Sequence, residues 1–385
     1  MDELRIGIVG LGNMGGTYCG QFSAGEYKRC RLTAICDSDA QKLEAANAGD
    51  AKRFSDAREM FESGLIDAVI IATPHYAHTT LGIMALEKGL HTLVDKPISV
   101  HKADCERLIA AHTDSSVVFA AMFNQRTDPR YIKLKELIDS GELGKINRIN
   151  WIITDWFRTQ QYYSSGGWRA TWAGEGGGVL LNQCPHQLDL WQWLFGMPAK
   201  VRAFCGVGRY HEIEVEDDVT AYLEYADGSN GVFITTTGEA PGTNRLEIAA
   251  EKGRVIIEGD DLQWLRNEVP TSEWSKTCQG GFQKPAQWEI TIPAKGRGPQ
   301  HVGIIRNFIE AVLDGKPLIA PAEEGIHSVE LANGMIHSAD IGQTVNFPLD
   351  GATYEAALKK KIETSTFVKK VDESAGKAAD MSSTY

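Results

Sequence analysis

The sequence RIGIVGLGNMG, residues 5–15, joins a short apolar run to a glycine-rich turn. The turn fits the pattern G-x-G-x-x-G, in which the glycines allow a tight bend, close approach to a pyrophosphate and close packing of a helix on a strand. The following helix would offer unpaired N–H groups and a positive dipole end to phosphates. The pattern predicts a dinucleotide-binding turn, with a purely structural glycine turn as the alternative. Its residues are Gly10, Gly12, Asn13, Met14 and Gly15.

An acidic residue at the end of the next apolar run supports this interpretation. Asp37 closes that run and lies 22 residues beyond Gly15. A carboxylate at this distance can accept hydrogen bonds from the adenosine ribose, and it repels the 2′-phosphate of NADP. Its neighbours Ser38 and Asp39 offer no positive charge to such a phosphate. We therefore expect NAD in preference to NADP, with Asp37 and Ser38 at the ribose. The alternative is that Asp37 caps a helix beginning at Asp39.

Apolar runs and helix-like stretches alternate through the first 125 residues. The runs lack strict polar alternation, as expected for strands that are buried on both faces. They lie at 5–10, 32–37, 67–73, 91–95 and 117–123. The helix-like stretches lie at 13–24, 39–49, 76–89 and 101–112. This order predicts βαβ units and a parallel sheet, and hence an α/β Rossmann domain over residues 1–125.

Polar residues follow two of these expected strands. Ligands of open parallel sheets bind beyond the carboxyl ends of the strands, so these residues are candidates for a cofactor cleft. One strand runs into Thr73, Pro74, His75 and His78, and another runs into Asp95-Lys96-Pro97. We expect Lys96 to project toward the place of a nicotinamide. The alternative is a surface lysine at the start of a loop.

Longer runs with alternating polarity begin after residue 145. Turn signals at 227–231 and 252–253 join successive runs as hairpins. The expected strands are 148–156, 200–207, 219–225, 231–237, 246–250, 254–258 and 289–293. They predict an α+β domain over 126–370 with a large open antiparallel sheet. Helices would cover one face of this sheet, and a homodimer or homotetramer would cover the other.

Two features of composition support this division. All nine tryptophans lie beyond residue 150, so the two parts of the chain differ in character. The segment 371–385 is small and polar, and we expect it to be a disordered tail.

The richest chemistry lies in GGGVLLNQCPHQLD, residues 176–189. Pro185 suits the first turn of a helix, on which His186 and Asp189 would lie one turn apart. Asp189 could then orient the imidazole, and Asn182 could offer its amide to a hydroxyl. The alternative is a buried or capping histidine without a catalytic role.

Composition and charge exclude several classes of function. The 385 residues include 39 Lys and Arg against 51 Asp and Glu, and this net charge of −12 disfavours binding to nucleic acid or to anionic lipid. The seven cysteines have no spacing typical of a disulfide framework or a zinc site, so no metal is expected. We expect neither a secretory signal nor a membrane span. These features are typical of a reduced, cytoplasmic protein.

Four segments together resemble the Gfo/Idh/MocA family, named after glucose–fructose oxidoreductase, inositol dehydrogenase and MocA. They are GLGNMG, Asp95-Lys96-Pro97, Trp168-Arg169 and the segment 176–189. The resemblance implies a Rossmann domain followed by a domain with an open sheet. It also implies that Lys96 and His186 are catalytic. The positions that it assigns to the cofactor or the cleft are residues 10–15, Asp37, residues 73–78, Asn124, Trp168 and Arg169.

Two positions depart from the family pattern. Asp95 stands where glutamate is common, and Asn182 stands four residues before His186, where an acid is common. An amide can bind a hydroxyl but cannot take a proton, so the role of base falls to His186 alone.

The resemblance and the residues together predict NAD-dependent oxidation of a secondary hydroxyl on a sugar, glycoside or cyclic polyol. His186 would remove the hydroxyl proton, and Lys96 would stabilise the alkoxide. Candidates for contact with the carbohydrate are Asn182, Asp189, Arg126, Arg158, Tyr163 and Arg169, with Tyr162 beside them.

Three other functions remain open. The first is a redox-neutral enzyme that keeps its NAD and oxidises a glycoside only transiently in order to cleave it. The second is a non-catalytic NAD-binding sensor. The third is a hydrolase that uses Cys184 and His186, although residues two apart at a helix start rarely face each other.

Overall fold

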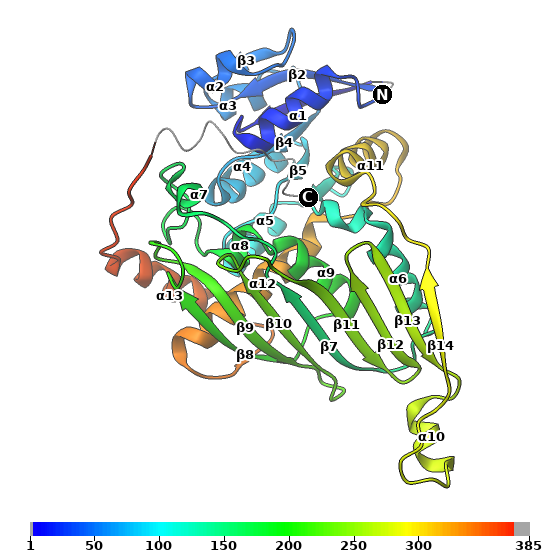
Figure 1. The fold of residues 1–385 in the computed structure, drawn as a ribbon. Coiled ribbons are helices and arrows are strands. Elements are labelled where there is room, and N and C mark those ends of the chain that lie inside the picture. Colours follow the sequence, from blue (N-terminus) through cyan, green and yellow to red (C-terminus); the bar gives the residue numbers. More distant parts are fainter. Residues whose placement is uncertain (1–2, 373–385) are drawn as a thin grey trace.

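A six-stranded parallel sheet forms the N-terminal part of the chain (Figure 1). The computed structural model describes residues 3–372, so all but the first two residues of the expected tail at 371–385 lie outside the described residues. The strand order is β3-β2-β1-β4-β5-β6. The strands are β1 (Leu4–Val9), β2 (Cys30–Cys36), β3 (Lys52–Phe54), β4 (Ala68–Ile71), β5 (His91–Val94) and β6 (Phe119–Ala121). The helices that follow the first five strands are α1 (Asn13–Ser23), α2 (Ala40–Ala45), α3 (Ala57–Glu62), α4 (His75–Glu87) and α5 (Lys102–Ala110).

This sheet is the predicted Rossmann fold. The central strand β4 is buried along its whole length, as expected for a parallel strand covered on both faces. The sequence analysis missed β3 and α3. The strand β3 is only three residues long, and two of them are charged and exposed at the edge of the sheet.

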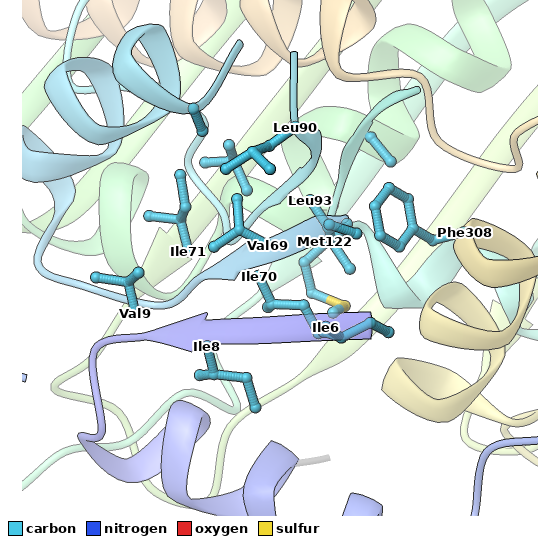
Figure 2. Packing of buried hydrophobic residues seen from close by; sticks show 14 of the residues in the cluster. Ile6, Ile8, Val9, Val69, Ile70, Ile71, Leu90, Leu93, Met122 and Phe308 are labelled. Carbon is cyan, nitrogen blue, oxygen red and sulfur yellow. The ribbon is translucent and has the colours of Figure 1, made fainter. Parts of the chain in front are cut away.

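A helix from much later in the chain packs into the hydrophobic core of this sheet. Helix α11 (Gln300–Asp314) places Ile304, Ile305 and Phe308 in the same hydrophobic cluster as the strands. Figure 2 shows Phe308 beside Leu93 and Met122 at one end of the sheet. The N-terminal core therefore includes residues that lie almost two hundred positions beyond β6.

A nine-stranded sheet forms the second part, with the order β14-β13-β12-β11-β7-β10-β9-β8-β15. Its strands are β7 (Ile146–Ile153), β8 (Lys200–Val207), β9 (Glu216–Glu224), β10 (Asn230–Thr236), β11 (Asn244–Ala250), β12 (Gly253–Glu258), β13 (Asp261–Asn267), β14 (Gln287–Ile292) and β15 (Val345–Asn346). The remaining α-helices are α6 (Pro129–Asp139), α7 (Gln160–Ser164), α8 (Val179–Asn182), α9 (Pro185–Phe195), α10 (Thr271–Thr277), α12 (Gly325–Ile341) and α13 (Gly351–Thr364). Two 3-10 helices are η1 (Asn124–Thr127) and η2 (Ala322–Glu324).

The second sheet is mostly antiparallel, as predicted, but it contains one parallel pair. Strand β10 runs parallel to β7, with Asn230 opposite Arg148. The hairpins β8–β9 and β9–β10 bring β10 back beside β7 in the same direction, which the pattern of hairpins alone did not indicate. The sequence analysis also missed β13, which carries mostly polar and charged residues.

The helices α9 and α12 lie between the second sheet and the first part of the molecule (Figure 1). Trp191 of α9 is fully buried in the second core. On the strands β8 and β9, Phe204 and Tyr222 are 63% and 45% exposed. Coverage of these exposed side chains by a second subunit stays a prediction.

Candidate active site

The glycine-rich turn has the shape that a dinucleotide needs. Gly10 has a φ of +88°, and a Cβ there would lie 2.6 Å from the carbonyl oxygen of Ala72. A Cβ on Gly15 would lie 1.8 Å from the carbonyl oxygen of Gly10, so only glycine lets α1 pack this closely. Gly12 faces open space at the start of α1 and has no side-chain cap. The turn thus fits a pyrophosphate held by backbone N–H groups.

Asp37 lies against this turn. Its carboxylate accepts from the backbone N–H of Leu11 at 2.7 Å and from that of Asp39 at 2.9 Å. The cap of α2 is Asp39, which accepts from Gln41 and Lys42. The alternative role of Asp37 as the cap of that helix is therefore wrong. The exposed Ser38 lies next to it at the same edge.

The ends of β4 and β5 are tied together by His78. Its Nδ1 lies 2.7 Å from the carbonyl oxygen of Pro97, and its Nε2 lies 2.7 Å from that of Thr73. Each ring nitrogen of His78 thus faces a main-chain carbonyl oxygen, and since burial lowers its pKa, the neutral ring donates to one of the two while lying between both loops. The ring of His75 lies 6.0 Å from that of His78, with Nδ1 3.3 Å from the carbonyl oxygen of Glu175 and its edge toward Trp168.

Lys96 bridges the two parts of the molecule. Its Nζ donates to the main-chain carbonyl of Asn182 at 2.7 Å. Asp95 accepts from the backbone N–H of Lys96 at 2.8 Å and from the hydroxyl of Tyr18 at 3.0 Å. Burial lowers the pKa of Lys96, and the negative charges of Asp95 and Glu175 oppose this effect.

His186 lies in the first turn of α9, directly after Pro185, as predicted. It is 3% exposed, and its Nδ1 has no hydrogen-bond partner among residues 3–372. Its ring meets Phe123 edge-on. Burial, and then the charges of Lys96 and His301, hold the pKa of His186 well below its ordinary value. The imidazole is therefore neutral near pH 7, and the same burial makes it a weaker base than an exposed imidazole.

Asp189 does not orient His186. Its carboxylate accepts from Nε and a terminal nitrogen of Arg126 at 2.7 and 2.6 Å, and from Gln192 at 3.1 Å. Arg126 also pairs with Glu324. Both Asp189 and Arg126 are saturated by these buried contacts, which leaves neither free for a substrate hydroxyl. Their positions in the sequence suggested contact with the substrate. In the structure each of these buried charges instead needs the other as its partner.

Tyr163 is also unavailable to a substrate. It is 2% exposed, and its hydroxyl shares a hydrogen bond with Thr237 at 2.7 Å. The neighbouring Tyr162 faces the site instead. Its hydroxyl accepts from Arg169 at 2.6 Å and lies 3.3 Å from Oδ1 of Asn182. Arg169 stacks between the rings of Tyr162 and Trp168.

Beside this cluster lies a polar cavity of about 220 Å³. Its walls include Trp156, Arg158 and Gln187, the residue after His186. The indole Nε1 of Trp156 and Oε1 of Gln187 are buried without partners among the described residues. Arg158 stacks over Trp156 at 5.5 Å. Unsatisfied polar groups beside an aromatic face are suited to binding the hydroxyls and the ring of a carbohydrate.

Asn124 connects this cavity to the first part of the chain. Its Nδ2 donates to Oε1 of Gln300 at 2.6 Å, and Gln300 lines the cavity. Its own Oδ1 is buried without a partner among the described residues.

The sequence analysis missed three residues of the site. His301 acts on the pKa of His186, Gln187 lines the cavity, and Glu175 contacts Asn182. Only Glu175 left a signal in the sequence, because a carboxylate inside a run of glycines is unusual. The other two are identified by the fold alone.

The arrangement does not suit a cysteine nucleophile. Cys184 lies 3.0 Å from the hydroxyl of Thr235, and burial raises the pKa of its thiol to about 12, so it stays protonated. Residues 3–372 hold no group of three or more side chains arranged to bind a metal ion. Within the same range, no helix is long and apolar enough to span a membrane.

Known proteins have sequences similar to this chain. A family model described as the oxidoreductase family with an NAD-binding Rossmann fold matches residues 4–123, and the GFO/IDH/MocA C-terminal domain matches residues 131–256. The uncharacterized oxidoreductase YdgJ of Escherichia coli is 27% identical over 88% of this chain and 97% of its own length. Levoglucosan dehydrogenase of Pseudarthrobacter phenanthrenivorans is 24% identical over 90% of this chain and 99% of its own.

A solved structure is also similar to this chain in both sequence and fold. The WlbA dehydrogenase from Bordetella pertussis, in complex with NADH and UDP-GlcNAcA, matches with a TM-score of 0.75 and 27% identity over 90% of this chain and 100% of that one. The matches to both domains, in this order, identify the protein: the chain belongs to the GFO/IDH/MocA family of oxidoreductases, and its N-terminal sheet is the NAD-binding Rossmann domain of that family.

Proposed function

We propose that this protein is an NAD-dependent dehydrogenase that oxidises a ring secondary hydroxyl of a sugar, glycoside or cyclic polyol, or reduces the corresponding ketone. One observation supports this most directly. Lys96 bonds to the carbonyl of Asn182, and its charge acts on His186. A cationic donor and a neutral imidazole thus lie near each other, and Lys96 directly follows the carboxyl end of β5, where ligands of parallel sheets bind.

The roles of these two residues follow from their charge states. His186 removes the proton of the substrate hydroxyl, because its imidazole is neutral and Nδ1 has no competing partner. Lys96 donates to the same oxygen and stabilises its developing negative charge. The turn at residues 10–15 and Asp37 would hold NAD, which, when bound, supplies the hydride acceptor.

The cavity beside the cluster supports a carbohydrate as the substrate. Trp156 offers an aromatic face, and Gln187 and Arg158 offer groups that bind hydroxyls. Among the relatives, one is named levoglucosan dehydrogenase and another, from Thermotoga maritima, myo-inositol 2-dehydrogenase. The WlbA complex contains UDP-GlcNAcA. We therefore place the substrate of this protein among sugars, glycosides and cyclic polyols.

Absorbance of reduced nicotinamide tests the proposal. Purified protein is screened with NAD and with NADP against inositols, free sugars and glycosides. We expect absorbance to rise with NAD and one class of carbohydrate. Cleavage of a glycoside without a rise, with cofactor retained through purification, would indicate the redox-neutral enzyme instead. Tight NADH binding without conversion of any carbohydrate would indicate a sensor.

A further inference from the structure

Glu175 is a buried carboxyl group that the chemistry described above does not use. It is 1% exposed and lies in the glycine-rich segment before α8. Its Oε2 accepts from the backbone N–H of Ala170 at 2.6 Å, and its Oε1 accepts from the side-chain amide of Asn182. A buried carboxylate is costly unless its charge is compensated. Burial raises the pKa of Glu175, whereas Arg169, the two hydrogen bonds and Lys369 oppose the rise and favour the charged form.

Three positive groups surround Glu175 from three different elements. Arg169 lies on the loop before it, Lys369 comes from the C-terminal segment, and Lys96 follows β5. Lys369 also donates to the carbonyl of Arg169 at 2.7 Å, which holds it beside the loop. Two further titratable groups lie near it: His75, whose ring faces the main-chain oxygen of Glu175, and Tyr163, whose pKa is raised by burial and also by the charge of Glu175. The carboxylate thus lies within a cluster of cations that includes the proposed alkoxide stabiliser.

Asn182 connects Glu175 to Lys96. Its side-chain amide donates to Glu175, and its main-chain carbonyl accepts from Nζ of Lys96. Its Oδ1 accepts from Gln183 at 3.1 Å, which fixes the orientation of the amide. Glu175 is therefore linked to Lys96 through a single residue, Asn182.

We propose that Glu175 is a positioning residue of the active site, which holds the amide of Asn182 in place and adds to the negative charge of Asp95 that favours the protonated form of Lys96. The inference rests on the proposed function for the role of Lys96. Burial lowers the pKa of Lys96, and Glu175 is one of the two carboxylates that raise it again. Loss of this charge should therefore deprotonate Lys96 at lower pH.

The test is the pH profile of kcat/KM for Glu175→Gln, measured with the carbohydrate found in the screen. We expect the alkaline limb to move to lower pH by less than about one unit, because Glu175 acts on Lys96 across Asn182, whereas charges in direct contact typically shift a pKa by about one to three units. The double variant Glu175→Gln, Asn182→Asp returns a carboxylate to the cluster, and it should move the limb back toward its original position.

Glu214→Gln is the matched control. Glu214 also accepts a backbone N–H of this loop, from Trp172 at 2.9 Å, but it is not among the groups that act on Lys96. We expect the alkaline limb of the pH profile of Glu214→Gln to stay at the same pH as in the wild type. If Glu175 only braces the loop, both variants will lower the melting temperature and neither will move the limb, which would overturn the proposal.

A second measurement is independent of turnover. The protein is reductively methylated with ¹³C, and the Lys96 signal is assigned by its absence in Lys96→Arg and followed through a pH titration. We expect the pKa of Lys96 to be lower in Glu175→Gln than in the wild type, and equal values would refute the inference. An inactive wild type with a lowered Lys96 pKa in the variant would count against the proposed function alone.

Discussion

Arg126 and Asp189 form a fully buried, two-pronged ion pair in which both side chains are 1% exposed. The pair joins η1, which follows the last Rossmann strand, to α9, which carries His186. It thereby fixes the base relative to the cofactor domain, although neither residue is available to the substrate.

Removal of Arg126 should destabilise the protein strongly. Arg126→Met leaves the carboxylate of Asp189 buried without its partner, and we expect the free energy of unfolding to fall by about 3–5 kcal/mol. Urea denaturation measures the change. Arg107→Met is the control, because Arg107 pairs with Asp104 and Glu355 while 48% exposed, and the loss should stay below about 1 kcal/mol. Equal losses in the two variants would contradict the assignment.

Removal of either proposed catalytic group should slow the reaction without affecting the cofactor. Lys96→Met and His186→Ala should each lower kcat by roughly 10²–10⁴. NADH affinity, measured by fluorescence titration, should stay within a few-fold of the wild type. Near-normal turnover in either variant would exclude its assigned role. Cys184→Ser serves as the control, because its protonated thiol has no part in the reaction.

Asp37 should control the choice between NAD and NADP. In Asp37→Asn the ribose loses a charged acceptor, so NADH binding should weaken about ten-fold or more. NADPH binding should strengthen relative to NADH, because the repulsion of the 2′-phosphate is gone. Fluorescence titration with both cofactors measures the ratio. Asp39→Asn, which changes the cap of α2, should leave that ratio unchanged.

Buried histidines should make the fold less stable in mild acid. Burial lowers the pKa of His301 to about 4, whereas an unfolded histidine titrates near 6.5. Below pH 6.5 the unfolded chain binds a proton that the folded chain excludes, so stability is complete above this pH and falls as the pH drops toward 4. His301 alone accounts for up to about 3 kcal/mol of this loss.

The same experiment has an internal control. His301→Gln should reduce the loss of stability between pH 7 and pH 4.5 in urea denaturation. His211 behaves in the opposite way, since Asp217 helps to raise its pKa, and His211→Gln should not reduce the loss. An unchanged slope in His301→Gln would show that this ring is not held neutral.

Local signals were sufficient to predict the cofactor side of the molecule. The turn at residues 10–15 requires glycine for reasons of backbone shape, and these reasons are visible in the sequence. Pro185 marked the start of α9 in the same way, because proline suits the first turn of a helix. Such features depend on neighbours within a few residues, so a sequence displays them directly.

The partners of charged side chains could not be predicted in this way. Arg126 and Asp189 are 63 residues apart, and only the packing of η1 against α9 brings them together. The parallel pairing of β7 with β10 likewise depends on the path of the strands between them. The substrate contacts predicted for Arg126 and Asp189 from their positions in the sequence were therefore wrong, because each side chain is held in a buried ion pair with the other.

The contribution of α11 to the first core has a consequence for synthesis on the ribosome. Phe308 and its neighbours complete the hydrophobic core beneath the Rossmann strands, yet they are translated long after β6. During synthesis, the hydrophobic core of the nucleotide-binding sheet therefore stays incomplete until α11 has emerged from the ribosome, when most of the chain has been translated. A chimera that exchanges this half with a relative would have to exchange α11 as well.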